Sequence, residues 1–136
     1  MATERKSVTV YGLEHAVSAA RVAAEVGVAI YLISGEAAAA HAGPAWFRSL
    51  LEETRKQAPD ADVEGALDCD DFTGYALAAL REGLSTIIYN GTANDAVDDI
   101  ARQCNATVLR SRFVALDARA AESAGSLETA LRAWFT

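Results

Sequence analysis

Short β-branched segments that alternate with amphipathic segments are the feature that most constrains how this chain can fold. The strand-like segments begin near Val8, Val28, Val63, Thr86 and Thr107, and a segment with helical periodicity separates each from the next. A strand–helix–strand repeat places successive strands parallel in one sheet, with right-handed crossovers. The sequence therefore predicts an α/β fold with about five parallel strands, arranged as an open three-layer, flavodoxin-like sheet or as a half-barrel.

The predicted strands are short, and several of the predicted helices have recognisable ends. Strands are expected at 7–11, 28–33, 62–68, 85–89 and 106–109, with a further extended piece at 113–116. Gly27 is placed to end the first helix, Pro44 lies in the first turn of the second, and Ser126 can cap the last. Because no linker or low-complexity segment interrupts the pattern, residues 1–136 are predicted to form a single α/β domain.

The composition limits the functions that this chain can have. Its 12 Lys and Arg against 19 Asp and Glu give a net charge of −7, which argues against a nucleic-acid surface because phosphate binding needs clustered cations. No apolar run reaches the roughly 18 residues that a membrane-spanning helix needs. Residues 1–6 are not followed by the apolar stretch of a secretory signal. We therefore expect a soluble cytoplasmic protein that binds neither nucleic acid nor membrane.

Polar residues and glycines gather where the predicted strands end, which is the edge at which parallel sheets bind ligands. The strand-end segments are Tyr11-Gly12, Ser34-Gly35-Glu36, Asp68-Cys69-Asp70-Asp71, Asn90-Gly91-Thr92 and Arg110-Ser111-Arg112. Two of them look like glycine turns whose backbone N–H groups could hold an anion, although a tight turn alone would also explain each glycine. The candidate ligand-binding residues are Ser34, Gly35, Asp70, Asn90, Gly91 and Thr92.

The segment Asp68–Asp71 is the most distinctive of these strand ends. Its three carboxylates and one thiol could bind a divalent cation, or hold one acid protonated beside its neighbours. Asp70 or Asp71 could instead cap the helix that follows, just as Thr92 could cap the next one. Asp68 is the last residue of its strand and is not explained by capping, so it is the candidate catalytic residue.

The cysteines and histidines add few candidate site residues to those at the strand ends. Cys69 lies beside a helix start and could bind a metal as a thiolate, although the neighbouring carboxylates raise its pKa. Cys104 falls on the apolar stripe of its helix and is expected in the core. His15 and His41 follow the first two strands and could face the same pocket, but surface positions are commoner for histidine. No GxGxxG or GxxxxGK[ST] motif supports nucleotide binding.

Three segments follow one another in an order that carries a family resemblance. They are Ala39-Ala40-His41-Ala42-Gly43, then Leu67-Asp68-Cys69, then the run AALREGLSTIIYNGT from Ala78 to Thr92. In this order the chain resembles the early part of the class II fructose-bisphosphate aldolases, which are (β/α)8 barrels with a zinc site. Those enzymes read Leu-Asp-His where this chain has Leu67-Asp68-Cys69.

The resemblance implies roles for two residues. Asp68 stands at the position of the family's catalytic acid, and Cys69 at that of a zinc-binding histidine; a thiolate is also a zinc ligand. A complete barrel needs roughly 200–250 residues, so 136 residues correspond to a half-barrel without the family's other zinc ligands and phosphate-binding loops. We therefore expect no full aldolase activity from a single copy of this chain.

Three functions remain open, and the sequence does not decide between enzyme and non-enzyme. The first is binding of a small anionic or carbonyl ligand at the strand ends, without full aldolase activity. The second is a metal-assisted, aldolase-like lyase with zinc as candidate cofactor, completed in a homodimer or larger oligomer. The third is an interaction or scaffold domain without a ligand. Trp46, Phe47, Trp134 and Phe135 are expected in the core, with a dimer contact as the alternative.

Overall fold

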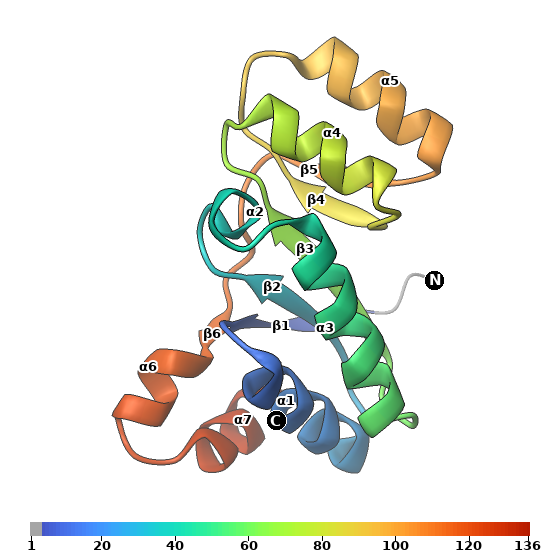
Figure 1. Cartoon of the computed structure of the whole chain (residues 1–136). Coiled ribbons are helices and arrows are strands. Elements are labelled where there is room, and N and C mark those ends of the chain that lie inside the picture. Colours follow the sequence, from blue (N-terminus) through green and yellow to red (C-terminus); the bar gives the residue numbers. More distant parts are fainter. Residues whose placement is uncertain (1–3) are drawn as a thin grey trace. The chain divides into compact units, whose positions relative to one another are not determined.

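A computed structural model describes residues 4–136 and contains a parallel six-stranded sheet with helices between the strands (Figure 1). The strands are β1 (Arg5–Val10), β2 (Ala29–Ser34), β3 (Val63–Asp68), β4 (Thr86–Ile88), β5 (Thr107–Leu109) and β6 (Leu116–Asp117). The helices are α1 (Leu13–Val26), α2 (Ala38–His41), α3 (Pro44–Gln57), α4 (Thr73–Arg81), α5 (Asn94–Cys104), α6 (Ala118–Ser123) and α7 (Leu127–Phe135). The predicted α/β class with an open parallel sheet is confirmed.

The strand order is β5-β4-β3-β2-β1-β6. The first five strands therefore neighbour one another in sequence order, as strands do in the wall of a (β/α)8 barrel, whereas flavodoxin has the order 2-1-3-4-5. The last extended piece, predicted at 113–116, is the two-residue strand β6 at Leu116–Asp117. None of the helices in the described part of the chain has the length and apolar character that crossing a membrane requires.

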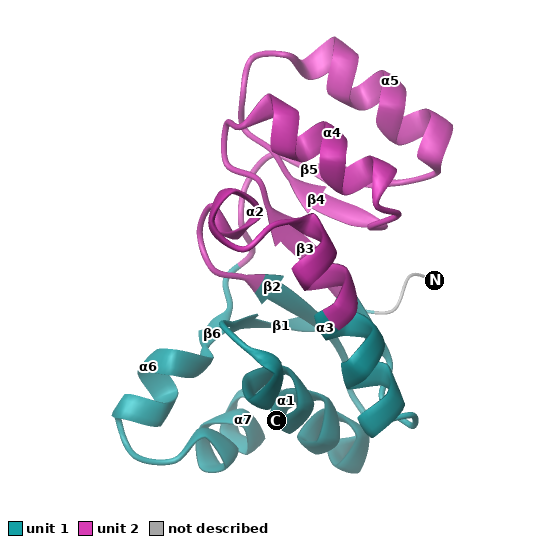
Figure 2. Ribbon diagram, in the orientation of Figure 1, with its two compact units in different colours: residues 1–33, 50–64, 114–136 teal, residues 34–49, 65–113 magenta. Residues whose placement is uncertain are grey.

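The chain divides into two compact units, which are described separately (Figure 2). Unit 1 comprises residues 1–33, 50–64 and 114–136, and unit 2 comprises residues 34–49 and 65–113. That residues 1–136 form a single domain stays a prediction.

Unit 1 contains the pairing of β1 with β6, in which Thr9 lies opposite Asp117. Helix α1 packs against α7 and buries a face of small side chains: Ala16, Val17, Ala19, Ala20, Val22 and Ala23. Gly27 follows α1 in the left-handed conformation, with a φ of 77° that glycine adopts without strain. The Ser126 hydroxyl accepts the Thr129 N–H at 3.2 Å and caps α7. Both predicted helix ends are confirmed.

Unit 2 is built around β4, which pairs in parallel with β3 and with β5. Leu67, Ile87 and Ile88 are buried in these strands, and α4 packs against both α2 and α5. Pro44 is the first residue of α3, as predicted. Phe47 on that helix is fully buried, while the neighbouring Trp46 is half-buried.

Two of the predicted helix starts are wrong. Helix α4 begins at Thr73 with Phe72 as its N-cap residue, and α5 begins at Asn94 with Ala93 in that position. Neither N-cap side chain makes a capping hydrogen bond, so Asp70 and Asp71 do not cap α4 and Thr92 does not cap α5. The carboxylates of the Asp68–Asp71 segment therefore need another explanation.

The expected core position of Cys104 is also wrong, because this cysteine is exposed. The buried residues of α5 are Val97 and Ala101, which lie four residues apart on one helical face. Cys104 is the last residue of α5 and lies outside this buried face. Of the remaining aromatic residues, Phe135 is buried and Trp134 is half-buried in unit 1.

Candidate functional site

A polar pocket in unit 2 lies at the carboxyl ends of its strands. It has a volume of about 250 Å³ and is lined by Glu36, Asp68, Asp70, Ile88, Asn90, Ser111 and Arg112. Asp68 and Ile88 are the last residues of β3 and β4, and the others come from the segments that follow β2, β3, β4 and β5. We call this the strand-end pocket, because parallel α/β sheets bind their ligands at the carboxyl ends of their strands.

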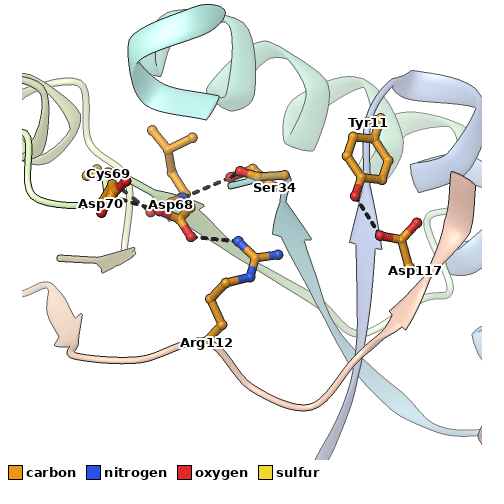
Figure 3. Close-up of polar contacts among 9 residues, drawn as sticks. Tyr11, Ser34, Asp68, Cys69, Asp70, Arg112 and Asp117 are labelled. Carbon is orange, nitrogen blue, oxygen red and sulfur yellow. Dashed lines mark hydrogen bonds and ion pairs between the residues drawn. The ribbon is translucent and has the colours of Figure 1, made fainter. Parts of the chain in front are cut away.

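Asp68 is the most buried charged group of the strand-end pocket, with a side chain that is 6% exposed. Its Oδ2 accepts a hydrogen bond from Arg112 Nη1 at 2.6 Å, and its Oδ1 accepts the Asp70 N–H at 2.8 Å (Figure 3). Its own backbone N–H donates to Ser34 Oγ at 2.8 Å. A carboxylate removed from water requires both a counter-charge and hydrogen-bond donors. Arg112 and Asp70 supply them.

The chain reverses sharply at Asp70, directly after β3. Asp70 has a φ of 49°, in the left-handed region that aspartate tolerates better than most residues. This conformation directs the Asp70 N–H back to the Asp68 side chain. It also directs the Asp70 carbonyl oxygen toward Asn90, and this oxygen accepts the Asn90 N–H at 2.9 Å. The loops that follow β3 and β4 are thereby joined by a backbone hydrogen bond.

The residues expected at the site from sequence divide into three groups. Asp68, Asp70 and Asn90 line the strand-end pocket. Ser34 is buried behind it and acts through the hydrogen bond from the Asp68 N–H. The adjoining residues Gly35, Gly91 and Thr92 belong to the same turns but do not line the pocket.

Cys69, the candidate metal ligand, is fully buried. Its thiol Sγ lies 3.7 Å from the Leu67 carbonyl oxygen. Burial, and secondly the charge of Asp68, raise the pKa of the Cys69 thiol to about 12. Zinc binding needs a thiolate, and residues 4–136 contain no group of three or more His, Cys, Asp or Glu placed to hold a metal. The zinc that the aldolase resemblance implies does not fit these residues.

Arg112, Glu36 and Ser111 also line the pocket. They belong to the predicted strand-end segments but were not among the candidate site residues. A signal for Arg112 was present, because a carboxylate that ends a buried strand needs a cation nearby. The strand-end segments contain only two cations, Arg110 and Arg112. The structure separates them: Arg110 pairs with the exposed Asp98, and Arg112 pairs with Asp68.

Unit 1 has a second polar group of residues at its strand ends, which we call the Tyr11 cluster: Tyr11, Asp117 and Arg119. The Tyr11 hydroxyl donates to Asp117 Oδ2 at 2.6 Å (Figure 3). Asp117 Oδ1 accepts the Ala120 N–H at 3.0 Å and so caps α6. The Arg119 guanidinium carbon lies 3.8 Å from the centre of the Tyr11 ring. Asp117 therefore has a local structural role.

Neither histidine lines the strand-end pocket. His41 is exposed at the end of α2. His15 lies in unit 1, where its Nδ1 accepts the Tyr11 N–H at 3.2 Å and its Nε2 lies 3.0 Å from Glu122 Oε1. Nδ1 thus binds the backbone just before α1, and Nε2 connects α1 with α6.

Neither a protein-family model nor a curated protein matches this chain. A function is therefore inferred from the chemistry of the strand-end pocket.

Proposed function

We propose that the strand-end pocket binds a small, uncharged carbonyl compound that carries hydroxyl groups, and that it does so without full aldolase activity. The observation that carries this proposal is the mixture of acceptors and donors around the pocket: Glu36, Asp68 and Asp70 accept hydrogen bonds, and Asn90, Ser111 and Arg112 donate them. Ligand hydroxyl groups can donate to the carboxylates, and a ligand carbonyl oxygen can accept from the amide or the hydroxyl.

The charge of the pocket disfavours an anionic ligand. Three carboxylates and one guanidinium give 1 − 3 = −2. A phosphate would compete with Asp68 for Arg112 and would lie near Glu36 and Asp70, and like charges brought together in a pocket are costly. Of the anionic and carbonyl ligands expected from sequence, the carbonyl ligand is therefore favoured.

The size of the pocket favours a small metabolite. Its volume of about 250 Å³ is below the range of pockets that hold drug-sized ligands. A sugar or ketone of about three to five carbons suits such a volume.

The contacts of Asp68 favour binding over catalysis. A general acid or base must exchange a proton with the substrate, whereas both oxygens of Asp68 are engaged by Arg112 and the Asp70 N–H. The metal-assisted lyase loses support from the burial and raised pKa of Cys69. We keep a cytoplasmic location, a homodimer and a relation to aldolase-like half-barrels as proposals, the last supported by the sequence-ordered strands β1 to β5.

The binding proposal is tested by titrating ¹⁵N-labelled protein with dihydroxyacetone and, separately, with dihydroxyacetone phosphate. We expect saturable changes at the amide signals of Asp70 and Asn90 with the uncharged compound, and binding at least roughly tenfold weaker with the phosphate, because of the repulsion by the pocket carboxylates. Tighter binding of the phosphate would reverse the charge argument. No saturable change with dihydroxyacetone, D-erythrose or D-ribose would reject the proposal.

Asp70→Asn and Asp71→Asn form a matched pair for this titration. Both remove one negative charge, but only Asp70 lines the pocket, and asparagine tolerates its left-handed conformation. We expect Asp70→Asn to weaken dihydroxyacetone binding by roughly three- to tenfold and to improve phosphate binding, while Asp71→Asn changes neither. Equal effects of the two variants would place the ligand elsewhere.

The competing lyase is tested by metal analysis and by an aldol-cleavage assay with fructose 1,6-bisphosphate. We expect far less than one zinc per chain and no cleavage above background. One zinc per chain that is lost in Cys69→Ser, together with measurable cleavage, would favour the lyase instead.

A further inference from the structure

We infer that the Tyr89 hydroxyl holds the starts of α4 and α5 together and thereby positions both loops of the strand-end pocket. Tyr89 directly follows β4 and is fully buried. Its Oη accepts the Ala93 N–H at 3.0 Å and lies 2.7 Å from Thr73 Oγ1. Ala93 is the N-cap residue of α5, and Thr73 is the first residue of α4. One phenol oxygen thus contacts the beginnings of both helices.

The contact matters most for α5, whose N-cap residue Ala93 has no capping side chain and donates its backbone N–H to Tyr89. Helix α4 also lacks a capping side chain and is held through the hydroxyl of Thr73. The first N–H groups of a helix have no partner within the helix. In a capping box, the N–H of the N-cap residue is satisfied by a side chain from the first turn. For α5 this N–H belongs to Ala93, and Tyr89 from the preceding strand end supplies the acceptor.

The loop that follows Tyr89 is packed directly against its ring. A Cβ atom built on Gly91 would lie 2.5 Å from Tyr89 Cζ and 2.6 Å from Cε1, so only glycine fits at this approach. Asn90 lies between these two residues, and its N–H donates to the Asp70 carbonyl oxygen at 2.9 Å. The positions of Asn90 and Asp70, which both line the pocket, are therefore set by the packing around Tyr89.

Tyr89 itself does not line the pocket, so it is a positioning residue that acts through Asp70 and Asn90. Its effect on binding rests on the proposed function, whereas its contact with the helix starts does not. Tyr89→Phe removes only the hydroxyl and is the variant of choice. Tyr75→Phe is the matched control, because Tyr75 lies on α4 with an exposed side chain.

The experiment compares amide hydrogen exchange and dihydroxyacetone binding in the wild type, Tyr89→Phe and Tyr75→Phe. In Tyr89→Phe we expect exchange of the Ala93 amide to accelerate roughly tenfold and the affinity for dihydroxyacetone to fall roughly five- to tenfold, since one buried hydrogen-bonding group is lost. The signals of Asp70 and Asn90 should shift in the free protein. Tyr75→Phe should match the wild type in all three measurements.

Thr73 supplies a second pair of variants that keeps the test decisive if Tyr89→Phe does not fold. Thr73→Val removes the hydroxyl that contacts Tyr89 and should weaken binding, whereas Thr73→Ser retains it and should restore wild-type affinity. Wild-type affinity in both Tyr89→Phe and Thr73→Val would overturn the positioning role. If the wild type does not bind dihydroxyacetone, the proposed function fails. The contact with the helix starts is tested separately, and it would be overturned if the Ala93 amide exchanged at the same rate in Tyr89→Phe as in the wild type.

Discussion

Each unit ends a strand on an aspartate, and the two carboxylates are stabilised differently. In unit 2, Asp68 is buried and is neutralised by Arg112. In unit 1, Asp117 is half-buried and accepts hydrogen bonds from the Tyr11 hydroxyl and the Ala120 N–H. Only Asp117 caps the helix that follows it.

The difference separates a structural carboxylate from a candidate functional one. A capping aspartate stabilises its own helix, so the fold explains its presence. A buried ion pair is weak evidence for stability, because the cost of desolvating two charges often exceeds their attraction. The Asp68–Arg112 pair lines a pocket and caps no helix, which is what the proposed ligand-binding role expects.

The largest expected effect comes from breaking the Asp68–Arg112 pair, in which Asp68 is buried and the Arg112 side chain is 25% exposed. Arg112→Met would leave the Asp68 carboxylate in the protein without a counter-charge. We expect the free energy of unfolding to fall by about 3–5 kcal/mol, measured by urea denaturation. Replacing both partners, as in Asp68→Leu with Arg112→Met, should recover most of the loss, because a buried apolar pair carries no desolvation cost.

Arg110 provides the control for this prediction. Arg110 Nη2 contacts both oxygens of Asp98, at 2.7 and 2.8 Å, but the two side chains are 44% and 38% exposed. We expect Arg110→Met to cost less than about 1 kcal/mol, as exposed ion pairs do. If Arg110→Met and Arg112→Met lowered the free energy of unfolding equally, burial would not distinguish the Asp68–Arg112 pair from the exposed Asp98–Arg110 pair.

The fold could be predicted from the sequence because its signals are local. Apolar β-branched runs and helical stripes gave the α/β class, and Gly27, Pro44 and Ser126 marked helix ends correctly. Each of these signals depends on residues within one or two turns of one another. The strand order depends on contacts between distant segments and was not predicted.

The lining of the candidate site was predicted only in part, for the same reason. Asp68 was proposed from its place at a strand end, but its partner Arg112 is 44 residues away and was not assigned. The capping roles given to Asp70 or Asp71 and to Thr92 were wrong, because α4 and α5 have Phe72 and Ala93 as their N-cap residues. The position of a helix start is the least reliable part of a prediction from sequence, since it shifts by a residue or more with the packing of the preceding loop.

An intermediate effect is expected from removing the structural carboxylate of unit 1. Asp117→Ala removes the acceptor for the Ala120 N–H and for the Tyr11 hydroxyl, and should lower the free energy of unfolding by about 1–2 kcal/mol. Tyr11→Phe removes only the hydrogen bond from the hydroxyl and should cost about 0.5–1.5 kcal/mol. Urea denaturation measures both. A loss in Asp117→Ala as large as that in Arg112→Met would contradict the separation of a capping carboxylate from a buried ion pair.

The smallest effect concerns pH and also belongs to Asp117. Burial by itself raises the pKa of Asp117, but the hydrogen bonds from Tyr11 and from the backbone N–H groups of Ala120 and Arg119, with the charge of Arg119, outweigh it and hold the pKa below 3.8. The unfolded chain therefore binds a proton at this residue more readily than the folded chain does. The stabilisation by Asp117 is fully present above its unfolded pKa and is lost as pH falls through the folded pKa.

Asp117→Asn tests this directly, because asparagine does not titrate and keeps one oxygen as an acceptor. The difference in unfolding free energy between the wild type and Asp117→Asn should be constant from about pH 7 to pH 5 and should shrink as pH falls below about 4. Urea denaturation at successive pH values gives that difference. The hydrogen bonds to Asp117 favour its charged form. If the difference in unfolding free energy grew in acid instead, Asp117 would be held protonated in the folded chain, and these hydrogen bonds would not explain how its carboxylate is stabilised.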